Sequence, residues 1–316
     1  MTFFIGTDEA GYGPNLGPLV ITATAWQFPD GTTAEQGWEL LQDSICQTAP
    51  KSDEKLQVAD SKQVYASGRS IEPLERAVLS AMRQFSHSPT SLLKLGSAIC
   101  NAAFQQHYHS EPCPPPNPVS LPLKAGAASI AASSRCLSEA LTSADARLVG
   151  LRSRIVYPTE FNQLVTEAGS KGKVLSAETL QLVAELLEEH APEAALVICD
   201  KHGGRNRYDE LIADAFGGEF VFRQEEGRQL SRYRLNQFEF RFQTKAEEHL
   251  PVALASMISK YIREVAMMEF NAYWADLVPD LKPTKGYPVD AARFLDDIDE
   301  IRRRHGIDTD TIWRCR

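Results

Sequence analysis

The sequence contains no long apolar run, no closely spaced pair of cysteines and no excess of basic residues. Its longest apolar stretches, such as residues 194–199, are too short to span a bilayer. The six cysteines lie far apart, which disfavours a zinc site and favours reduced thiols. Because the acidic pair Asp8 and Glu9 follows Met1 so closely, we expect no signal peptide and a cytoplasmic protein.

The charge balance disfavours a uniformly basic nucleic-acid-binding surface. The chain carries 33 basic and 42 acidic residues, a net charge of −9, so a polyanionic partner would need a locally basic face. Residues 228–245 are one candidate, because they contain five basic residues and one acid, a local charge of +4. The same stretch could equally be an exposed strand pair with solvated arginines.

Composition and periodicity predict a folded α/β protein. Apolar residues make up 43% of the 316 residues and charged ones 24%, which excludes a disordered chain and is enough for a large core. Apolar patterns predict strands over 2–7, 19–26, 147–156, 194–200 and 219–224, and helices over 73–85, 126–141, 158–167, 176–190, 251–270 and 289–305. We expect Ser176 to cap its helix. A change of apolar phase within a long strand at 232–243 predicts a turn or bulge near Asn236–Gln237. Strands that alternate with long crossovers indicate a mixed sheet flanked by helices.

The domain organisation follows from where this alternation is interrupted. We predict a single domain over residues 1–316. The proline-rich residues 112–118 form an extended connector, so we interpret residues 86–145 as an insertion. Residues 270–316 are predicted to form a C-terminal helical extension.

Acidic residues lie at the ends of several predicted strands. Asp8 and Glu9 directly follow the first strand, Asp200 ends a central one, and Glu247 precedes the helix at 251–270. In open α/β sheets, sites form beyond the carboxyl ends of the strands. Carboxylates that meet there repel one another unless a divalent cation neutralises them, and Mg²⁺ or Mn²⁺ prefers such oxygen ligands. This pattern favours a metal-assisted displacement at phosphorus.

A glycine- and proline-rich turn follows the first acidic pair. It lacks the Gly-Lys-Ser/Thr ending of a nucleotide P-loop. Pro14 and Pro18 prevent a helix from starting there, which argues against a dinucleotide fingerprint. We therefore interpret it as a strand-to-strand turn whose glycines, Gly11 and Gly13, allow a ligand to approach the backbone closely.

Residues 8–20, D-E-A-G-Y-G-P-N-L-G-P-L-V, resemble the opening motif D-E-A-G-R-G-P-x-x-G-P-x-V of the type 2 ribonucleases H, that is, ribonuclease HII and its archaeal and eukaryotic relatives. Further similarities follow in the family's order. They are A-D-S-K at 59–62, V-I-C-D at 197–200, K-A-E at 245–247, A-S-M-I-S-K-Y-I-R-E at 255–264 and K-G-Y-P at 285–288. The resemblance covers residues 1–65 and 147–316 and omits the insertion.

This resemblance implies a ribonuclease H-like fold and hydrolysis of RNA in RNA/DNA hybrids, or at ribonucleotides embedded in DNA, with Mg²⁺ or Mn²⁺. From the short apolar runs we expect no membrane association, and no obligate protein partner is evident in the sequence. Carried over by position, the catalytic and metal-binding residues are Asp8, Glu9, Asp200 and Glu247. The implied nucleic-acid contacts are Gly11, Tyr12, Gly13, Lys62, Lys245, Lys260 and Tyr287.

Two residues depart from the family's motifs and leave alternatives open. Tyr12 stands where the family has arginine, and Glu247 stands where it has aspartate. One alternative is a catalytically attenuated relative that binds hybrid. The other is a DNA-acting nuclease or phosphoesterase on the same scaffold.

Overall fold

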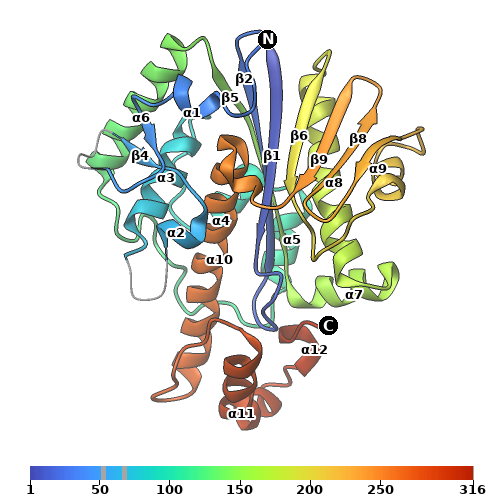
Figure 1. The fold of residues 1–316 in the computed structure, drawn as a ribbon. Helices are drawn as coiled ribbons and strands as arrows, with labels where there is room; N and C mark the ends of the chain where they lie inside the picture. The colour runs from blue at the N-terminus through green and yellow to red at the C-terminus, as the bar shows by residue number, and fades with distance from the viewer. Residues whose placement is uncertain (51–54, 66–69, 316) are drawn as a thin grey trace.

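A computed structural model describes residues 1–50, 55–65 and 70–315. Its centre is a seven-stranded sheet in the order β5-β2-β1-β6-β9-β8-β7. The strands are β1 (Thr2–Ala10), β2 (Leu19–Phe28), β5 (Arg147–Val156), β6 (Ala195–Asp200), β7 (Phe222–Glu226), β8 (Leu230–Leu235) and β9 (Phe238–Gln243). β1 pairs antiparallel with β2 and parallel with β6, and β6 pairs parallel with β9. The predicted mixed α/β sheet is therefore confirmed (Figure 1).

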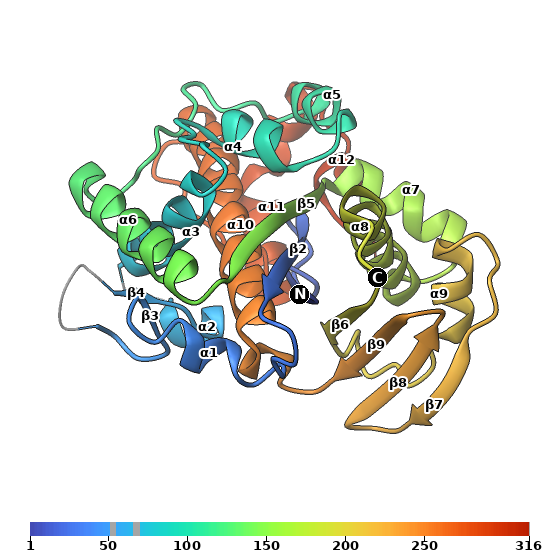
Figure 2. The ribbon, with the colours of Figure 1, turned by 90° about the horizontal axis from the view of Figure 1, so that it is seen from above.

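Helices cover both faces of this sheet. They are α1 (Gly37–Leu40), α2 (Ser61–Val64), α3 (Glu72–Arg83), α4 (Leu92–Ile99), α5 (Ala103–Ser110), α6 (Ala127–Ser143), α7 (Pro158–Ala168), α8 (Lys171–His190), α9 (Asp209–Ala215), α10 (Leu250–Leu277), α11 (Pro288–Arg304) and α12 (Thr309–Ile312). Figure 2 shows α10, α3 and α6 on one side of the sheet and α8, α7 and α9 on the other. Each side has its own buried apolar cluster. Among the helices of the described residues, none is long and apolar enough to cross a membrane.

The helix α10 packs directly on β1, because Gly6 has no side chain. A Cβ built on Gly6 would lie 2.3 Å from the backbone of Pro251 and Val252, at the start of α10. Substitution there would force the helix off the sheet. This close approach fixes the distance between α10 and β1, and therefore the position of α10 beside the end of the strand.

Several sequence predictions need correction. β1 extends to Ala10, because Asp8 and Glu9 pair with Thr22 and Ile21 of β2. Ser176 is not a helix cap. The helix α8 begins five residues earlier than expected, and Ser170 caps it by accepting a hydrogen bond from the Lys173 amide.

Of the turn and the bulge expected near Asn236–Gln237, the structure has the turn, which divides the expected long strand in two. β8 and β9 form an antiparallel hairpin, and Asn236 joins them with a positive φ of 52°. The outermost strand β7 begins three residues later than expected, at Phe222.

Residues 86–145 contribute α4, α5 and α6 to the α10 side of the sheet. The Glu75 carboxylate anchors this segment by accepting hydrogen bonds from the backbone amides of Leu123, Lys124 and Ala125, at 2.6, 2.7 and 2.8 Å. The Tyr261 hydroxyl of α10 donates to the same carboxylate at 2.6 Å. Separately, α10 continues beyond residue 270 to Leu277.

Candidate active site

Two of the predicted catalytic acids lie side by side at the carboxyl end of the sheet. The last paired residues of β1 and β6 are Thr7 and Cys199, so Asp8 and Asp200 occupy the next positions on neighbouring parallel strands. The Asp200 carboxylate accepts backbone hydrogen bonds from Lys201 and Ala246. The second of these bonds places the short 3₁₀ turn Ala246–Glu248, which carries Glu247, against the same strand end.

The four predicted acids, here called the carboxylate cluster (Asp8, Glu9, Asp200 and Glu247), act on one another electrostatically. Burial raises the pKa of Asp8 to about 7, and the Asp200 charge adds to this rise. Burial also raises the pKa of Glu9 well above its usual range, with Asp8 and Asp200 contributing. The pKa of Glu247 is raised by burial and then by Asp200. The cluster therefore disfavours full ionisation and would gain from a nearby cation.

Lys62 is the cation that these acids meet in the described structure. Its charge lowers the pKa values of Asp8, Glu9, Asp200 and Glu247, although other causes prevail. Burial acts to lower the pKa of Lys62, but the surrounding carboxylates, led by Asp60, raise it overall. Asp60 also caps the short helix α2 by accepting a hydrogen bond from the Lys62 amide at 3.0 Å. The segment 59–62 therefore lies beside the carboxylate cluster.

Two serines of α10 hold Asp8 in place. The Ser256 hydroxyl hydrogen-bonds to the Asp8 carboxyl and lies 3.0 Å from the Ser61 hydroxyl. The Ser259 hydroxyl lies 3.0 Å from the Asp8 carbonyl oxygen and 2.8 Å from the Thr22 hydroxyl. Both serines lie within the motif at 255–264, but the motif assigned them no role, because an uncharged hydroxyl by itself does not indicate a functional residue.

The donor set suits a hard divalent cation, because it consists of carboxylate oxygens. The raised pKa values of Asp8 and Glu9 point the same way, since a bound cation would favour their ionised forms. Across residues 1–50, 55–65 and 70–315, however, no group of three or more His, Cys, Asp or Glu side chains is positioned to hold a metal ion. The acids are thus within electrostatic range of one another, but their side chains do not form a complete metal-binding site.

The glycine turn (residues 11–18) is braced from behind by two buried arginines. The Arg263 guanidinium donates to the carbonyl oxygens of Pro18 and Leu16, at 2.7 and 3.2 Å, and to that of Lys285 at 3.1 Å. The Arg314 guanidinium, from the C-terminal segment, donates to the carbonyls of Gly11 and Pro14. Figure 1 shows α11 and α12 lying below this end of β1. Arg263 lies within the motif at 255–264, which gave it no role, and Arg314 lies outside the quoted motifs.

The two glycines of the motif differ in what they require. Gly11 has a φ of +92°, and a Cβ there would lie 2.6 Å from the Pro18 carbonyl oxygen and 2.8 Å from the Arg263 side chain. Gly13 has no positive φ, and a Cβ there would meet nothing within 4 Å among the described residues. The fold therefore requires glycine at position 11, whereas a side chain at position 13 would meet no described atom.

Tyr12 points from the turn toward the start of α8. The Lys171 ammonium lies 4.6 Å from the centroid of its ring. Burial, the largest cause, raises the pKa of the Tyr12 hydroxyl; the Glu9 charge raises it further and the Arg205 charge lowers it. The tyrosine therefore interacts with Glu9 of the carboxylate cluster and with two cations, Lys171 and Arg205.

The remaining predicted nucleic-acid contacts are Lys260, Tyr287 and Lys245, and each of them lines a cavity. Lys260 forms an ion pair with Glu264 at 2.6 Å. With Tyr287, which is 56% exposed, it lines a cavity of about 240 Å³ on α10. Lys245 is exposed and lies beside Glu247 in a second cavity of about 230 Å³. The structure therefore places these three residues in two separate pockets.

The basic stretch at 228–245 is partly neutralised by its own neighbours. Arg232 pairs with Glu225 at 3.3 Å, and Arg241 pairs with Glu239 at 2.6 Å. Both pairs lie on the outer β7–β8–β9 part of the sheet. Pairing of this kind reduces the free positive charge that the sequence suggested.

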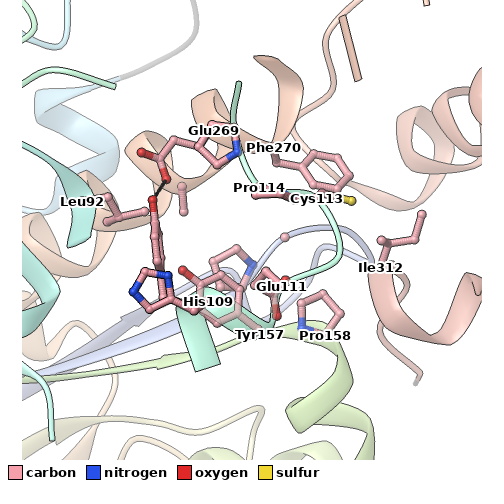
Figure 3. Close-up of a pocket in the computed structure, with 15 residues that line it drawn as sticks. Leu92, His109, Glu111, Cys113, Pro114, Tyr157, Pro158, Glu269, Phe270 and Ile312 are labelled. Atoms are coloured by element: carbon pink, nitrogen blue, oxygen red, sulfur yellow. Dashed lines mark hydrogen bonds between the residues drawn. The ribbon is translucent and has the colours of Figure 1, made fainter. Parts of the chain in front are cut away.

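A further cavity of about 110 Å³ lies behind the glycine turn, and none of the predicted contact residues lines it. In Figure 3, Glu269 and Phe270 form one wall, and His109, Glu111 and Tyr157 lie opposite. Burial raises the pKa of Glu111 to about 8. This cavity marks the contact between the segment 86–145, α10 and the C-terminal residues.

No known protein-family profile and no curated protein matches the sequence. Solved structures do resemble it. One is ribonuclease HII of Archaeoglobus fulgidus in its complex with PCNA (14% identity, TM-score 0.41, covering 99% of this chain and 94% of that one). A second is ribonuclease H2 from Pyrococcus horikoshii OT3 (14% identity, TM-score 0.44, covering 98% and 92%).

A third is Bst-RNase HIII in complex with Mn²⁺ (15% identity, TM-score 0.44), where the match covers 99% of this chain and 66% of that one. These proteins bear the names of the class that the sequence motifs resemble. Identities of 14–15% and TM-scores below 0.5 assign neither substrate nor chemistry to this chain.

Proposed function

We propose that this chain is a metal-dependent endonuclease that hydrolyses RNA in RNA/DNA hybrids, or at ribonucleotides embedded in DNA. The observation that carries the proposal is the position of Asp8 and Asp200 at neighbouring strand ends, with the glycine turn leading directly away from Asp8. In this proposal, the acids and the glycine turn belong to one site.

Asp8, Glu9, Asp200 and Glu247 are the residues that would hold Mg²⁺ or Mn²⁺. When bound, such an ion supplies positive charge to a phosphate and favours ionisation of a water molecule. The chain's own part is to position and orient. The Ser256 and Ser259 hydroxyls fix the Asp8 side chain and backbone, so that its carboxylate needs little reorganisation.

Lys62 and the glycine turn have complementary roles in this proposal. The Lys62 ammonium, held beside the acids, attracts a substrate phosphate toward them. Residues 11–13 present backbone amides and carbonyls, with no side chain at Gly13 to keep a ribose away. Contact with a 2′-hydroxyl at this point would distinguish RNA from DNA.

One observation favours a second candidate, an attenuated relative that binds hybrid. The described acids surround a lysine charge and do not form a group of three that could hold a metal ion. In that case hybrid binding would persist without metal-dependent cleavage.

The test is a substrate panel with Mg²⁺, with Mn²⁺ and with chelator. The substrates are an RNA/DNA hybrid, duplex DNA with one embedded ribonucleotide, and plain duplex DNA. We expect metal-dependent cuts in the first two only, because a reader of the 2′-hydroxyl rejects plain DNA. Binding of hybrid without any cut would support the attenuated relative, and cleavage of plain DNA would point to a DNA-acting enzyme.

A further inference from the structure

The Tyr12 side chain brings three elements together beside Glu9. Besides the Lys171 ammonium over its ring, its hydroxyl lies against the loop after β6, where a Cβ on Gly203 would be only 2.9 Å away. A Cβ on Gly172 would lie 3.5 Å from the same hydroxyl and 3.9 Å from Nη2 of Arg205. The tyrosine, the lysine and the arginine therefore converge at the first turn of α8.

Lys171 and Arg205, here called the cation pair, are not engaged by carboxylates. Within the described part of the chain neither forms an ion pair, and the buried Nε of Arg205 has no hydrogen-bond partner. Neighbouring cations differ. Lys260 pairs with Glu264 at 2.6 Å, and the Lys201 ammonium donates to the Gly227 carbonyl at 2.9 Å. The cation pair thus retains its capacity to bind an anion.

The charges around the glycine turn favour binding of a phosphate at the cation pair. A substrate strand that reaches the glycine turn meets the charges of the carboxylate cluster, which repel its phosphates. The cation pair lies at the first turn of the 20-residue helix α8, where the helix dipole is positive. Two cations and a helix N-terminus at one point favour a phosphate there.

We propose that Lys171 and Arg205, positioned by Tyr12, bind a backbone phosphate of the nucleic-acid strand that lies along residues 11–13. This inference rests on the proposed function and assigns a specificity subsite to the same site. The turn itself carries Tyr12, and the two cations beside it come from α8 and from the loop after β6.

The first experiment compares two double variants of equal charge. Lys171→Ala/Arg205→Ala removes the cation pair. Lys173→Ala/Arg207→Ala is the matched control, because residues two apart on a helix face different directions and Arg207 is 79% exposed and paired with Glu226. Binding of labelled hybrid is measured by fluorescence anisotropy without divalent cations, over a range of salt concentrations.

We expect the first variant to raise the Kd for hybrid about tenfold near 0.1 M salt and to reduce the slope of log K against log salt by about 1 to 2. The control should change the Kd by less than about threefold. Equal losses in the two variants would overturn the inference, since the effect would then come from net charge alone.

A charge exchange tests the role of Tyr12. Tyr12→Arg alone places a third cation against the pair, so we expect weaker hybrid binding and a lower Tm. Tyr12→Arg/Lys171→Ala restores the number of charges, and we expect its Kd to return to within about threefold of wild type. Additive losses in this double variant would contradict a shared phosphate site, and this comparison still decides if the alanine pair fails to fold.

Failure of the inference is distinguishable from failure of the proposed function. If wild-type protein neither binds nor cuts hybrid, the proposed function is wrong. If wild type cuts hybrid with Mg²⁺ while the cation-pair variant binds as its control does, only the assignment of Lys171 and Arg205 is wrong.

Discussion

The two sides of the glycine turn differ in their contacts. We call the side of Arg263 and Arg314 the back, and the side of the carboxylate cluster and the cation pair the front. Behind the turn, Arg263 and Arg314 together donate to the carbonyls of five residues, and α10 and the C-terminal segment cover them. In front, four acids with raised pKa values lie around Lys62. Lys171 and Arg205 lie beside Tyr12 and form no ion pair among the described residues.

The difference separates stability from function. Hydrogen bonds from a buried guanidinium satisfy carbonyls that would otherwise be costly to bury, so the back fixes the path of the turn. Mutual repulsion in front costs free energy of folding, and a ligand or cation of opposite charge can relieve it. Variants of the front should therefore change activity more than stability, and variants of the back should do the reverse.

The largest expected effect belongs to the front. Asp8→Asn should reduce metal-dependent cleavage of hybrid by about a thousandfold, because a ligand and a positioned charge disappear together. The fold should persist, since an amide can still accept the hydrogen bond from the Glu9 amide. Glu248→Gln, an exposed neighbour of Glu247, is the control and should keep its activity. Undiminished turnover in Asp8→Asn would refute the proposed site.

The next effect belongs to the back. Arg263→Ala leaves the carbonyls of Leu16, Pro18 and Lys285 without their donor, and we expect the free energy of unfolding to fall by about 2–4 kcal/mol. Arg234→Ala, an exposed change, should stay within about 0.5 kcal/mol. Denaturant unfolding measures both. Equal stability of the two variants would contradict the claim that the back of the turn stabilises the fold.

The two motif glycines test the same distinction within three residues. Gly11→Ala should lower the free energy of unfolding by about 1–3 kcal/mol, because it forces a side chain into a positive φ and against Pro18. Gly13→Ala should leave stability within about 0.5 kcal/mol while reducing cleavage of hybrid about tenfold or more, if a ribose approaches there. Wild-type cleavage by a folded Gly13→Ala variant would exclude that approach.

The smallest effect is a pH dependence of stability. The pKa of Asp8 is raised from its ordinary 3.8 to about 7, so folding favours its neutral form. Its contribution to stability is therefore present below the unfolded pKa and is lost as the pH rises toward the folded one. Without divalent cations, Asp8→Asn should gain about 1–2 kcal/mol over wild type between about pH 5 and pH 8. A difference that stays constant with pH would show that Asp8 titrates normally.

The mixed α/β class, the long helices and the acids at strand ends could be predicted from local sequence patterns. Alternating and helical periodicities are local, so they located β5 and α10 and separated β8 from β9 at Asn236. The motif 8–20 located the turn for the same reason. The Ser176 cap was wrong because a local signature cannot exclude a cap that lies six residues earlier.

The surroundings of the glycine turn depend on how distant segments pack together, and no local pattern predicts them. Asn15 and Arg314 are 299 residues apart in sequence, yet the Asn15 amide donates to the Arg314 carbonyl at 3.2 Å. Lys62 among the acids, and Lys171 and Arg205 at Tyr12, likewise come from segments with no shared pattern. The physical reason is that periodicity reports which face of an element is buried, whereas the partner of a charge depends on how distant elements pack.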